Sequence, residues 1–171
     1  IHASAERFRE PAEMATHLNA VLHPHFRSLG SELFVGLFYG VLHLPSGRIS
    51  YVNCGHVPPL LCTASGETEQ LHTGGIVLGV SETPSYEEQA TALEPGDLLV
   101  LCTDGVLGRR NPEKEEFSAE HIARIVRGHA PASAQDIADQ VMAAAEQFGG
   151  REREDDATIL IAARLPAANG A

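Results

Sequence analysis

Cysteine is scarce in this sequence, and the spacing of the few that occur excludes two kinds of stabilising site. There are 3 cysteines, Cys54, Cys62 and Cys102, in 171 residues. An odd number without any Cys-x-x-Cys spacing argues against a disulfide framework and against a zinc site. Two of the three lie in or beside apolar runs. We therefore expect reduced thiols, as in a cytoplasmic protein.

Long apolar runs and basic side chains are also lacking. No run approaches the roughly 20 residues of a membrane span. Residues 1–7 have neither an initiator Met nor the apolar core of a signal peptide, so we expect the chain to begin inside a longer protein. Lys and Arg number 12 against 23 Asp and Glu, a net charge of −11. This acidity disfavours nucleic acid and anionic membranes as main partners.

The chain is long enough to form one domain with a hydrophobic core. Along the sequence, segments with a helical pattern are separated from segments with a strand pattern. The apolar spacing predicts a helix over residues 11–22, ended around Pro24, and later helices capped by Ser118 and Ser133. The expected strands are residues 33–42, 48–53, 60–62, 68–71, 86–93, 98–102 and 159–163. Polar and apolar residues alternate in the strand at 48–53, so we expect it to be half exposed. The order predicts an α+β fold of two sheets packed face to face with helices outside.

Acidic residues stand at the ends of two of these strands. The apolar run 98–102 stops just before Asp104, and Asp155 and Asp156 precede the run 159–163. If the two strands pair antiparallel, Asp104 meets the other two carboxylates, whose oxygens are ligands that Mg²⁺ and Mn²⁺ prefer. Taken singly, Asp-Gly is also typical of a turn and Asp-Asp of a solvated strand entry. Their combination favours a metal site.

Two other candidate sites receive a structural interpretation. His23 and His25 form a His-x-His pair, but Pro lies between them and no further ligand is nearby, which disfavours metal binding. Gly74 and Gly75 precede no expected helix, so close backbone packing is favoured over a phosphate cradle.

Six short motifs occur in an order that resembles one known family. They are Phe34-Val35-Gly36-Leu37-Phe38-Tyr39-Gly40-Val41, Asn53-Cys54-Gly55-His56-Val57-Pro58-Pro59-Leu60, Gly75 with Leu78-Gly79, Glu94-Pro95-Gly96-Asp97, Thr103-Asp104-Gly105-Val106 and Asp155-Asp156-Ala157-Thr158. Each is weak alone, but six in order are specific. From about residue 11 to residue 165 the chain resembles the SpoIIE/RsbU branch of the bacterial metal-dependent protein serine/threonine phosphatases, the type 2C or PPM superfamily.

The resemblance implies an α-β-β-α sandwich of two antiparallel sheets flanked by helices. It also implies two Mn²⁺ or Mg²⁺ ions at one edge of the sheets and a metal-bridging hydroxide that attacks phosphoserine or phosphothreonine. By position in the motifs, Asp104 and Asp155 are the expected catalytic metal ligands. Gly105 allows close backbone approach beside the metals, and Asp156 is a weaker candidate that supports the ligands.

Three further side chains lie in or near these motifs. The family places His56 in a structural loop, so a histidine with satisfied hydrogen bonds is favoured over an acid or base. Arg109 and Arg110 follow Asp104 and could reach a phosphate, but a solvated loop is favoured.

The sequence departs from the family in two places. The family opens with a strand carrying Gly-Asp-x-x-Gly-His-Gly, whose Asp bridges both metals, and no such motif occurs here. We therefore expect residues 1–171 to be a single domain, with its core at about 11–165, that lacks its first strand and is weakly active or inactive alone. Leu107-Gly108 also replaces a Thr-Glu-like pair in a segment that relays activation, which puts regulation in question.

The implied biology is bacterial stress or sporulation signalling through sigma-factor regulation. The expected substrate is a phosphorylated anti-sigma-factor antagonist, and an upstream sensor domain is expected in the full-length protein. A homodimer through the N-terminal helices would cover apolar surface that truncation exposes. Two alternatives stay open: a degenerate phosphatase fold that binds a signalling partner without turnover, and an unrelated α+β metal-binding domain.

Overall fold

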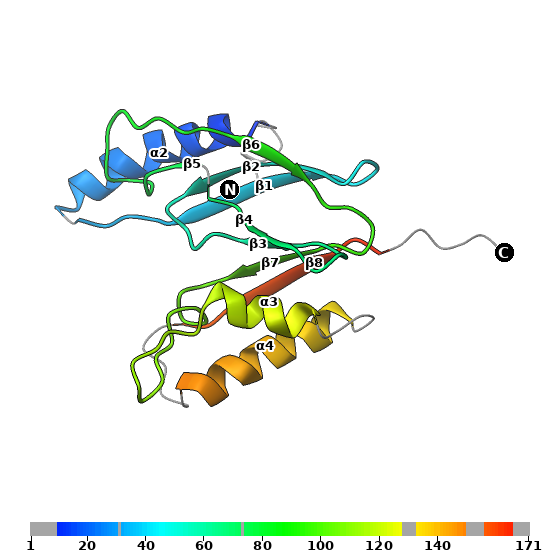
Figure 1. Ribbon diagram of the computed structural model, residues 1–171. Coiled ribbons are helices and arrows are strands. Elements are labelled where there is room, and N and C mark those ends of the chain that lie inside the picture. The colour runs from blue at the N-terminus through cyan, green and yellow to red at the C-terminus, as the bar shows by residue number, and fades with distance from the viewer. Residues whose placement is uncertain (1–9, 31, 73, 128–132, 150–155, 166–171) are drawn as a thin grey trace. The chain divides into compact units, whose positions relative to one another are not determined.

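The α+β class expected from the sequence is confirmed. The computed structural model describes residues 10–30, 32–72, 74–127, 133–149 and 156–165. The helices there are α2 (Pro11–Ser28), α3 (Ala119–Arg127) and α4 (Ala134–Gly149) (Figure 1). The strands are β1 (Leu37–His43), β2 (Arg48–Cys54), β3 (Leu60–Cys62), β4 (Thr68–Gln70), β5 (Gly74–Gly75), β6 (Gln89–Ala92), β7 (Leu98–Cys102) and β8 (Ile159–Ala163).

The chain forms two compact units, each with one sheet. The first unit comprises Ile1–Pro58 and Leu71–Ala92, and the second comprises Pro59–Gln70 and Leu93–Ala171. Among the described residues, no helix has the length and apolar character needed to cross a membrane.

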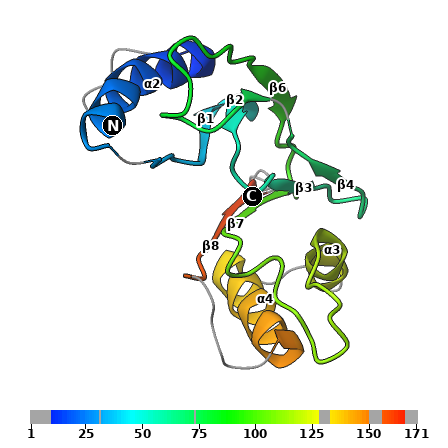
Figure 2. The ribbon, with the colours of Figure 1, turned by 90° about the vertical axis from the view of Figure 1, so that its left-hand side faces the viewer.

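In the first unit, β2 is the central strand and α2 packs on β1 and β2 (Figure 2). β1 pairs with β2 antiparallel along its whole length, whereas the other edge of β2 is shared by β6 and β5. β5 runs parallel to β2, so this sheet is mixed, whereas a wholly antiparallel sheet was expected. Gly74 must be glycine here, because a Cβ on it would lie 1.8 Å from the Asn53 carbonyl oxygen. This close approach agrees with the interpretation made from the sequence.

The prediction that the strand at 48–53 is half exposed was wrong. Val52, Asn53 and Cys54 are buried in succession, together with Ile49 and Tyr51. The alternation of residue types indicated one solvated face, but β2 is paired on both edges and covered by α2. Tertiary context therefore decided burial rather than local pattern.

Two boundaries in the first unit also differ from the predictions. α2 continues through Pro24 to Ser28 instead of ending near residue 22. Proline removes one helical hydrogen bond, but the continued helix carries the Phe26 ring against Gly79, where a Cβ would lie 2.5 Å from Phe26 Cδ2. The first strand begins at Leu37 rather than at residue 33, because Val35 makes only an isolated bridge to Leu78.

The second unit has the strand order β4-β3-β7-β8, with every pair antiparallel. α3 packs on β3, α4 packs on β8, and the two helices contact each other. Ile122 of α3 and Ile137 and Val141 of α4 are buried, as their helical spacing predicted. The predicted capping box at the start of α4 is also confirmed, since Ser133 Oγ accepts the Asp136 amide at 3.1 Å and Asp136 Oδ2 accepts the Ser133 amide at 3.2 Å.

Candidate functional site

The predicted antiparallel pairing of the two acidic strand ends is confirmed. β7 and β8 pair from Leu98 with Ala163 to Cys102 with Ile159. Because Cys102 is the last residue of β7 and Ile159 the first of β8, the segment after β7 lies beside the segment before β8. The backbone thus brings the Asp104 loop and the Asp156 segment to one end of the sheet.

Thr103 connects these two segments directly. Its amide donates to the Thr158 carbonyl oxygen at 3.1 Å, which extends the ladder one residue beyond β7. Its hydroxyl Oγ1 donates to the Asp156 carbonyl oxygen at 2.7 Å and accepts the Thr158 amide at 2.9 Å. One side chain therefore satisfies two backbone groups of the segment that carries Asp156.

Asp104 begins the turn that follows. Its side chain is exposed, and Oδ1 accepts the Gly105 amide at 3.0 Å. Among the described residues the carboxylate has no other hydrogen bond, so most of its lone pairs face solvent. Gly105 is buried, and its carbonyl oxygen accepts Arg109 Nε at 2.8 Å. The turn is thus held at its base and presents a carboxylate that is bonded, among the described residues, only by the Gly105 amide.

The structure describes only some of the other predicted metal ligands. Asp156 is exposed, and Asp155 lies outside the described residues. In the part of the chain that the structure describes, no group of three or more His, Cys, Asp or Glu side chains could hold a metal ion. The donors at this edge are carboxylate and carbonyl oxygens, the chemistry that suits Mn²⁺ or Mg²⁺. Their type fits such an ion, whereas the ligand assignment of Asp104, Gly105, Asp155 and Asp156 stays a prediction.

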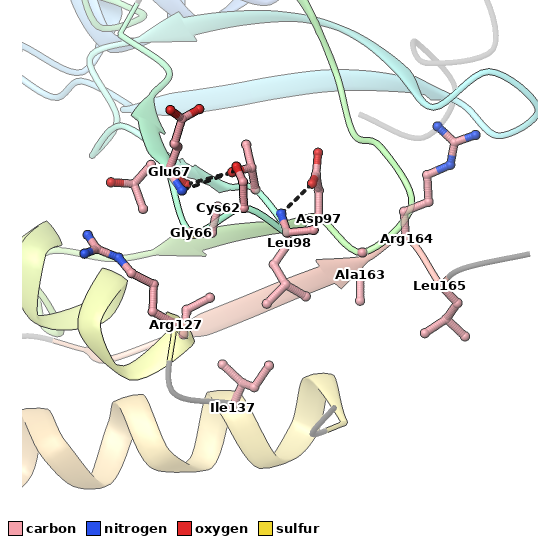
Figure 3. A pocket seen from close by; sticks show the side chains of 16 residues that line it. Cys62, Gly66, Glu67, Asp97, Leu98, Arg127, Ile137, Ala163, Arg164 and Leu165 are labelled. Carbon is pink, nitrogen blue, oxygen red and sulfur yellow. Dashed lines mark hydrogen bonds between the residues drawn. The ribbon is translucent and has the colours of Figure 1, made fainter. Parts of the chain in front are cut away.

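A cavity of about 540 Å³ lies at the opposite end of β7 (Figure 3). Leu98 and Ile137 contribute to its largely apolar wall, and the Arg127 side chain passes beside Gly66. Asp97 also lines it, but that carboxylate is 5% exposed, with Oδ1 bonded to the Ala64 amide and Oδ2 to the Glu94 amide. The cavity therefore offers no pair of unengaged carboxylates.

The other candidate side chains have structural partners. The His56 amide donates to Asn53 Oδ1 at 2.9 Å, and His56 Nδ1 lies 2.8 Å from the Val57 carbonyl oxygen, as expected for a satisfied loop histidine. Arg110 forms an exposed ion pair with Glu116 at 2.7 Å. Arg109 is half-buried and bonds the Gly105 carbonyl, so the expectation of a solvated position was wrong for this residue.

The three thiols are free, as expected for reduced cysteines, and all three are buried. Burial raises the pKa of Cys54, Cys62 and Cys102 to about 11 each. Since thiolates are the reactive form, the raised pKa values disfavour all three as nucleophiles.

Sequence reasoning missed two buried asparagines that brace loops in the first unit. Asn19 Nδ2 donates to the Ser81 carbonyl oxygen, and Asn19 Oδ1 accepts the Gly79 amide at 2.8 Å. Asn53 Nδ2 donates to the Leu71 carbonyl oxygen at 3.2 Å. A signal existed for Asn19, which lies four residues after the buried Ala15 and hence on the core-facing side of α2.

Comparison with known protein families gives a match along most of the chain. The family described as Stage II sporulation protein E (SpoIIE) matches residues 1–165. The phosphoserine phosphatase RsbU of Bacillus subtilis is 24% identical over 155 residues, which cover 90% of this chain and 45% of RsbU. The chain spans less than half the length of each of the curated relatives it matches.

Solved structures of low sequence identity share the fold. The SiaA-PP2C domain of Pseudomonas aeruginosa matches with a TM-score of 0.75 at 20% identity, over 94% of this chain and 64% of that domain. The phosphatase domain of the cell fate determinant SpoIIE from Bacillus subtilis, in a manganese-presoaked form, matches with a TM-score of 0.66 at 19% identity, over 91% of this chain and 66% of that domain.

Proposed function

Since the chain belongs to the SpoIIE family, we propose that it is a metal-dependent protein serine/threonine phosphatase domain. The observation that carries the proposal is the junction of β7 and β8, where Thr103 ties the Asp104 loop to the Asp156 segment. Two carboxylate-bearing segments, distant in sequence, are thereby held at one end of a sheet with exposed oxygens.

In this proposal Asp104 and Asp155 are the metal ligands, and Asp156 and Gly105 stand beside them. Bound Mn²⁺ or Mg²⁺ would lower the pKa of a metal-bound water, so that hydroxide is available near neutral pH. The ions would also offset the negative charge of the phosphoryl group. The protein supplies oxygens for this role and little positive charge of its own, since its net charge is −11. An acidic surface repels a phosphate dianion, so the positive field at the site must come from the ions.

The backbone of the turn around Asp104 is held in place by its own hydrogen bonds. Arg109 Nε holds the Gly105 carbonyl, and the Val106 amide donates to the Thr103 carbonyl oxygen at 3.0 Å. Arg109 is therefore engaged within the turn and is assigned no phosphate contact in this proposal.

The substrate we propose is phosphoserine or phosphothreonine on a bacterial signalling protein. A phosphorylated anti-sigma-factor antagonist in the cytoplasm is the expected partner, by analogy with RsbU, which is named a phosphoserine phosphatase. Residues 1–171 would act as one phosphatase domain, completed by an upstream strand that carries a further metal-binding Asp.

A non-catalytic module is the second candidate. It is favoured by one observation, that no cluster of three or more candidate metal-ligating side chains occurs among the described residues. Such a module would keep the fold to bind a signalling partner and would need no metal.

Manganese-dependent hydrolysis of p-nitrophenyl phosphate separates the two candidates. The chain would be compared with a version extended upstream through a Gly-Asp-x-x-Gly-His-Gly motif, each with and without Asp104→Ala. Turnover in the longer version that requires Mn²⁺ and disappears with Asp104→Ala supports the phosphatase. If the longer version neither binds Mn²⁺ nor turns over substrate, the catalytic proposal is wrong.

A further inference from the structure

We propose that Thr103 is a positioning residue whose hydroxyl sets the spacing between the Asp104 and Asp156 segments and thereby the metal affinity of the site. The inference rests on the proposed function, because it assigns a role within the same site. No metal ligand is assigned to Thr103 itself, which acts only through the backbone that carries the two aspartates.

The geometry of the junction singles out this hydroxyl. The paired strands β7 and β8 end at the Cys102–Ile159 pair, and one further backbone hydrogen bond, from the Thr103 amide to the Thr158 carbonyl oxygen, follows them. The Thr103 side chain adds two hydrogen bonds beyond this point, since its hydroxyl accepts the Thr158 amide and donates to the Asp156 carbonyl oxygen. Residues 156 and 158 are thus fixed to a single oxygen atom.

The same residue controls the Asp104 side of the junction. The amides of Val106 and Leu107 both donate to the Thr103 carbonyl oxygen, at 3.0 and 3.3 Å, and so close the turn that presents Asp104. Thr103 therefore connects three pieces of backbone: the end of β7, the Asp104 turn and the Asp156 segment.

Metal binding makes this spacing consequential. Mn²⁺ and Mg²⁺ accept little variation in oxygen position, with Mg²⁺ requiring ligands at about 2.0–2.1 Å. Residues that orient metal ligands from outside the coordination sphere typically change affinity by about 10- to 100-fold when they are removed. A threonine that fixes two ligand-bearing segments should fall in this range, at its lower end because it holds backbone rather than the carboxylates themselves.

The test compares Thr103→Val, Thr103→Ser and wild type in the full-length protein as its gene encodes it. Valine has the shape of threonine without the hydroxyl, and serine keeps the hydroxyl. Mn²⁺ affinity would be measured by the electron paramagnetic resonance signal of free Mn²⁺, and protection of the Thr158 amide by hydrogen exchange without metal. We expect Thr103→Val to weaken Mn²⁺ binding by about tenfold and to lose protection at Thr158, and Thr103→Ser to retain both.

Two control variants exclude a general loss of stability. Thr68→Val makes the same substitution on β4, away from the β7–β8 junction, and should bind Mn²⁺ as wild type does. Val100→Ala removes volume from the buried centre of β7 and should lower the unfolding temperature without changing the Mn²⁺ affinity.

The outcomes distinguish failure of this inference from failure of the proposed function. If wild type binds Mn²⁺ in an Asp104-dependent manner but Thr103→Val binds equally well, the role of Thr103 is refuted and the phosphatase site stands. An equal loss of affinity in Val100→Ala, or no rescue by Thr103→Ser, also refutes it. If wild type shows no Asp104-dependent Mn²⁺ binding, the proposed function fails and the inference fails with it.

Discussion

β7 carries an aspartate beyond each end, and the two are used in opposite ways. Asp97, just before the strand, is 5% exposed, and its two carboxylate oxygens accept the amides of Ala64 and Glu94 at 2.9 and 2.8 Å. Asp104, just after the strand, is exposed and bonds only the neighbouring Gly105 amide among the described residues. The same residue type therefore closes a turn at one end and leaves oxygens unengaged at the other.

The difference shows how a structural carboxylate can be told from a candidate ligand. A buried carboxylate must have its oxygens bonded, or the cost of burial is not offset. Asp97 meets this requirement with one backbone donor on each oxygen, which leaves it less free than Asp104 to bind a metal. Asp104 can give lone pairs to an ion because, among the described residues, only the Gly105 amide bonds its carboxylate.

The largest effect we expect is the loss of function in Asp104→Asn. The amide keeps an oxygen for Gly105 but removes the charge that a hard cation needs. Manganese-dependent hydrolysis by the full-length protein should fall by at least about 100-fold, while the free energy of unfolding without metal changes by less than about 0.5 kcal/mol. An equally large loss of stability would show that Asp104 is structural after all, and the contrast with Asp97 would disappear.

Asp97→Ala should give the opposite result, a loss of stability without a loss of Mn²⁺ affinity. It removes the acceptor from two partly buried hydrogen bonds, those of the Ala64 and Glu94 amides to a charged group, and such bonds contribute about 1.5–3 kcal/mol each. Urea denaturation should therefore show a free energy of unfolding lower by about 2–4 kcal/mol. The Mn²⁺ affinity of the folded variant should equal that of wild type. A variant as stable as wild type would mean that these two hydrogen bonds do not hold the turn.

Tyr86→Phe, in the first unit, also tests the rule that a buried polar group needs a hydrogen-bond partner. Here the substitution should increase the free energy of unfolding rather than lower it. Tyr86 is 9% exposed, and its hydroxyl is buried without a hydrogen-bond partner in the part of the chain that is described. Burial also raises the pKa of this phenol to about 12. Removing an unsatisfied group should raise the free energy of unfolding by about 1 kcal/mol, measured by urea denaturation. Tyr39→Phe, at a half-buried position, serves as the control and should change it less. A destabilised Tyr86→Phe would indicate that the hydroxyl has a partner.

The smallest effect concerns a third aspartate that is partnered but exposed. Hydrogen bonds from the Ser133 hydroxyl and amide lower the pKa of Asp136 from its ordinary value of 3.8. A lowered pKa means that this pair stabilises the fold above pH 3.8 and that the contribution is lost as the pH falls below it. In Ser133→Ala the pKa of Asp136 should move back toward 3.8, which an NMR titration of the side chain would detect. An unchanged pKa would assign the shift to another cause.

Much of the fold was predictable because local pattern and tertiary structure agree in the second unit. The runs at 98–102 and 159–163 are strands and pair as expected, since each is an apolar segment bounded by turn residues. In the first unit the predictions failed where neighbours decided the outcome. Pro24 did not stop α2, and the alternation in β2 did not give an exposed face, because helix and strand are held by packing on elements distant in sequence.

The sequence by itself determined the chemistry available to this protein. Its motifs, its acidic composition and the aspartates at strand ends were readable without coordinates, because strand ends and turns leave local signatures. Only the tertiary structure decided which aspartate is free and which is engaged, since Asp97 finds its donors partly in Ala64, 33 residues earlier. The role of Thr103 was equally hidden, because its hydroxyl acts on backbone groups 53 and 55 residues away. Hydrogen bonds across such separations depend on which strands become neighbours, and local pattern carries no information about them.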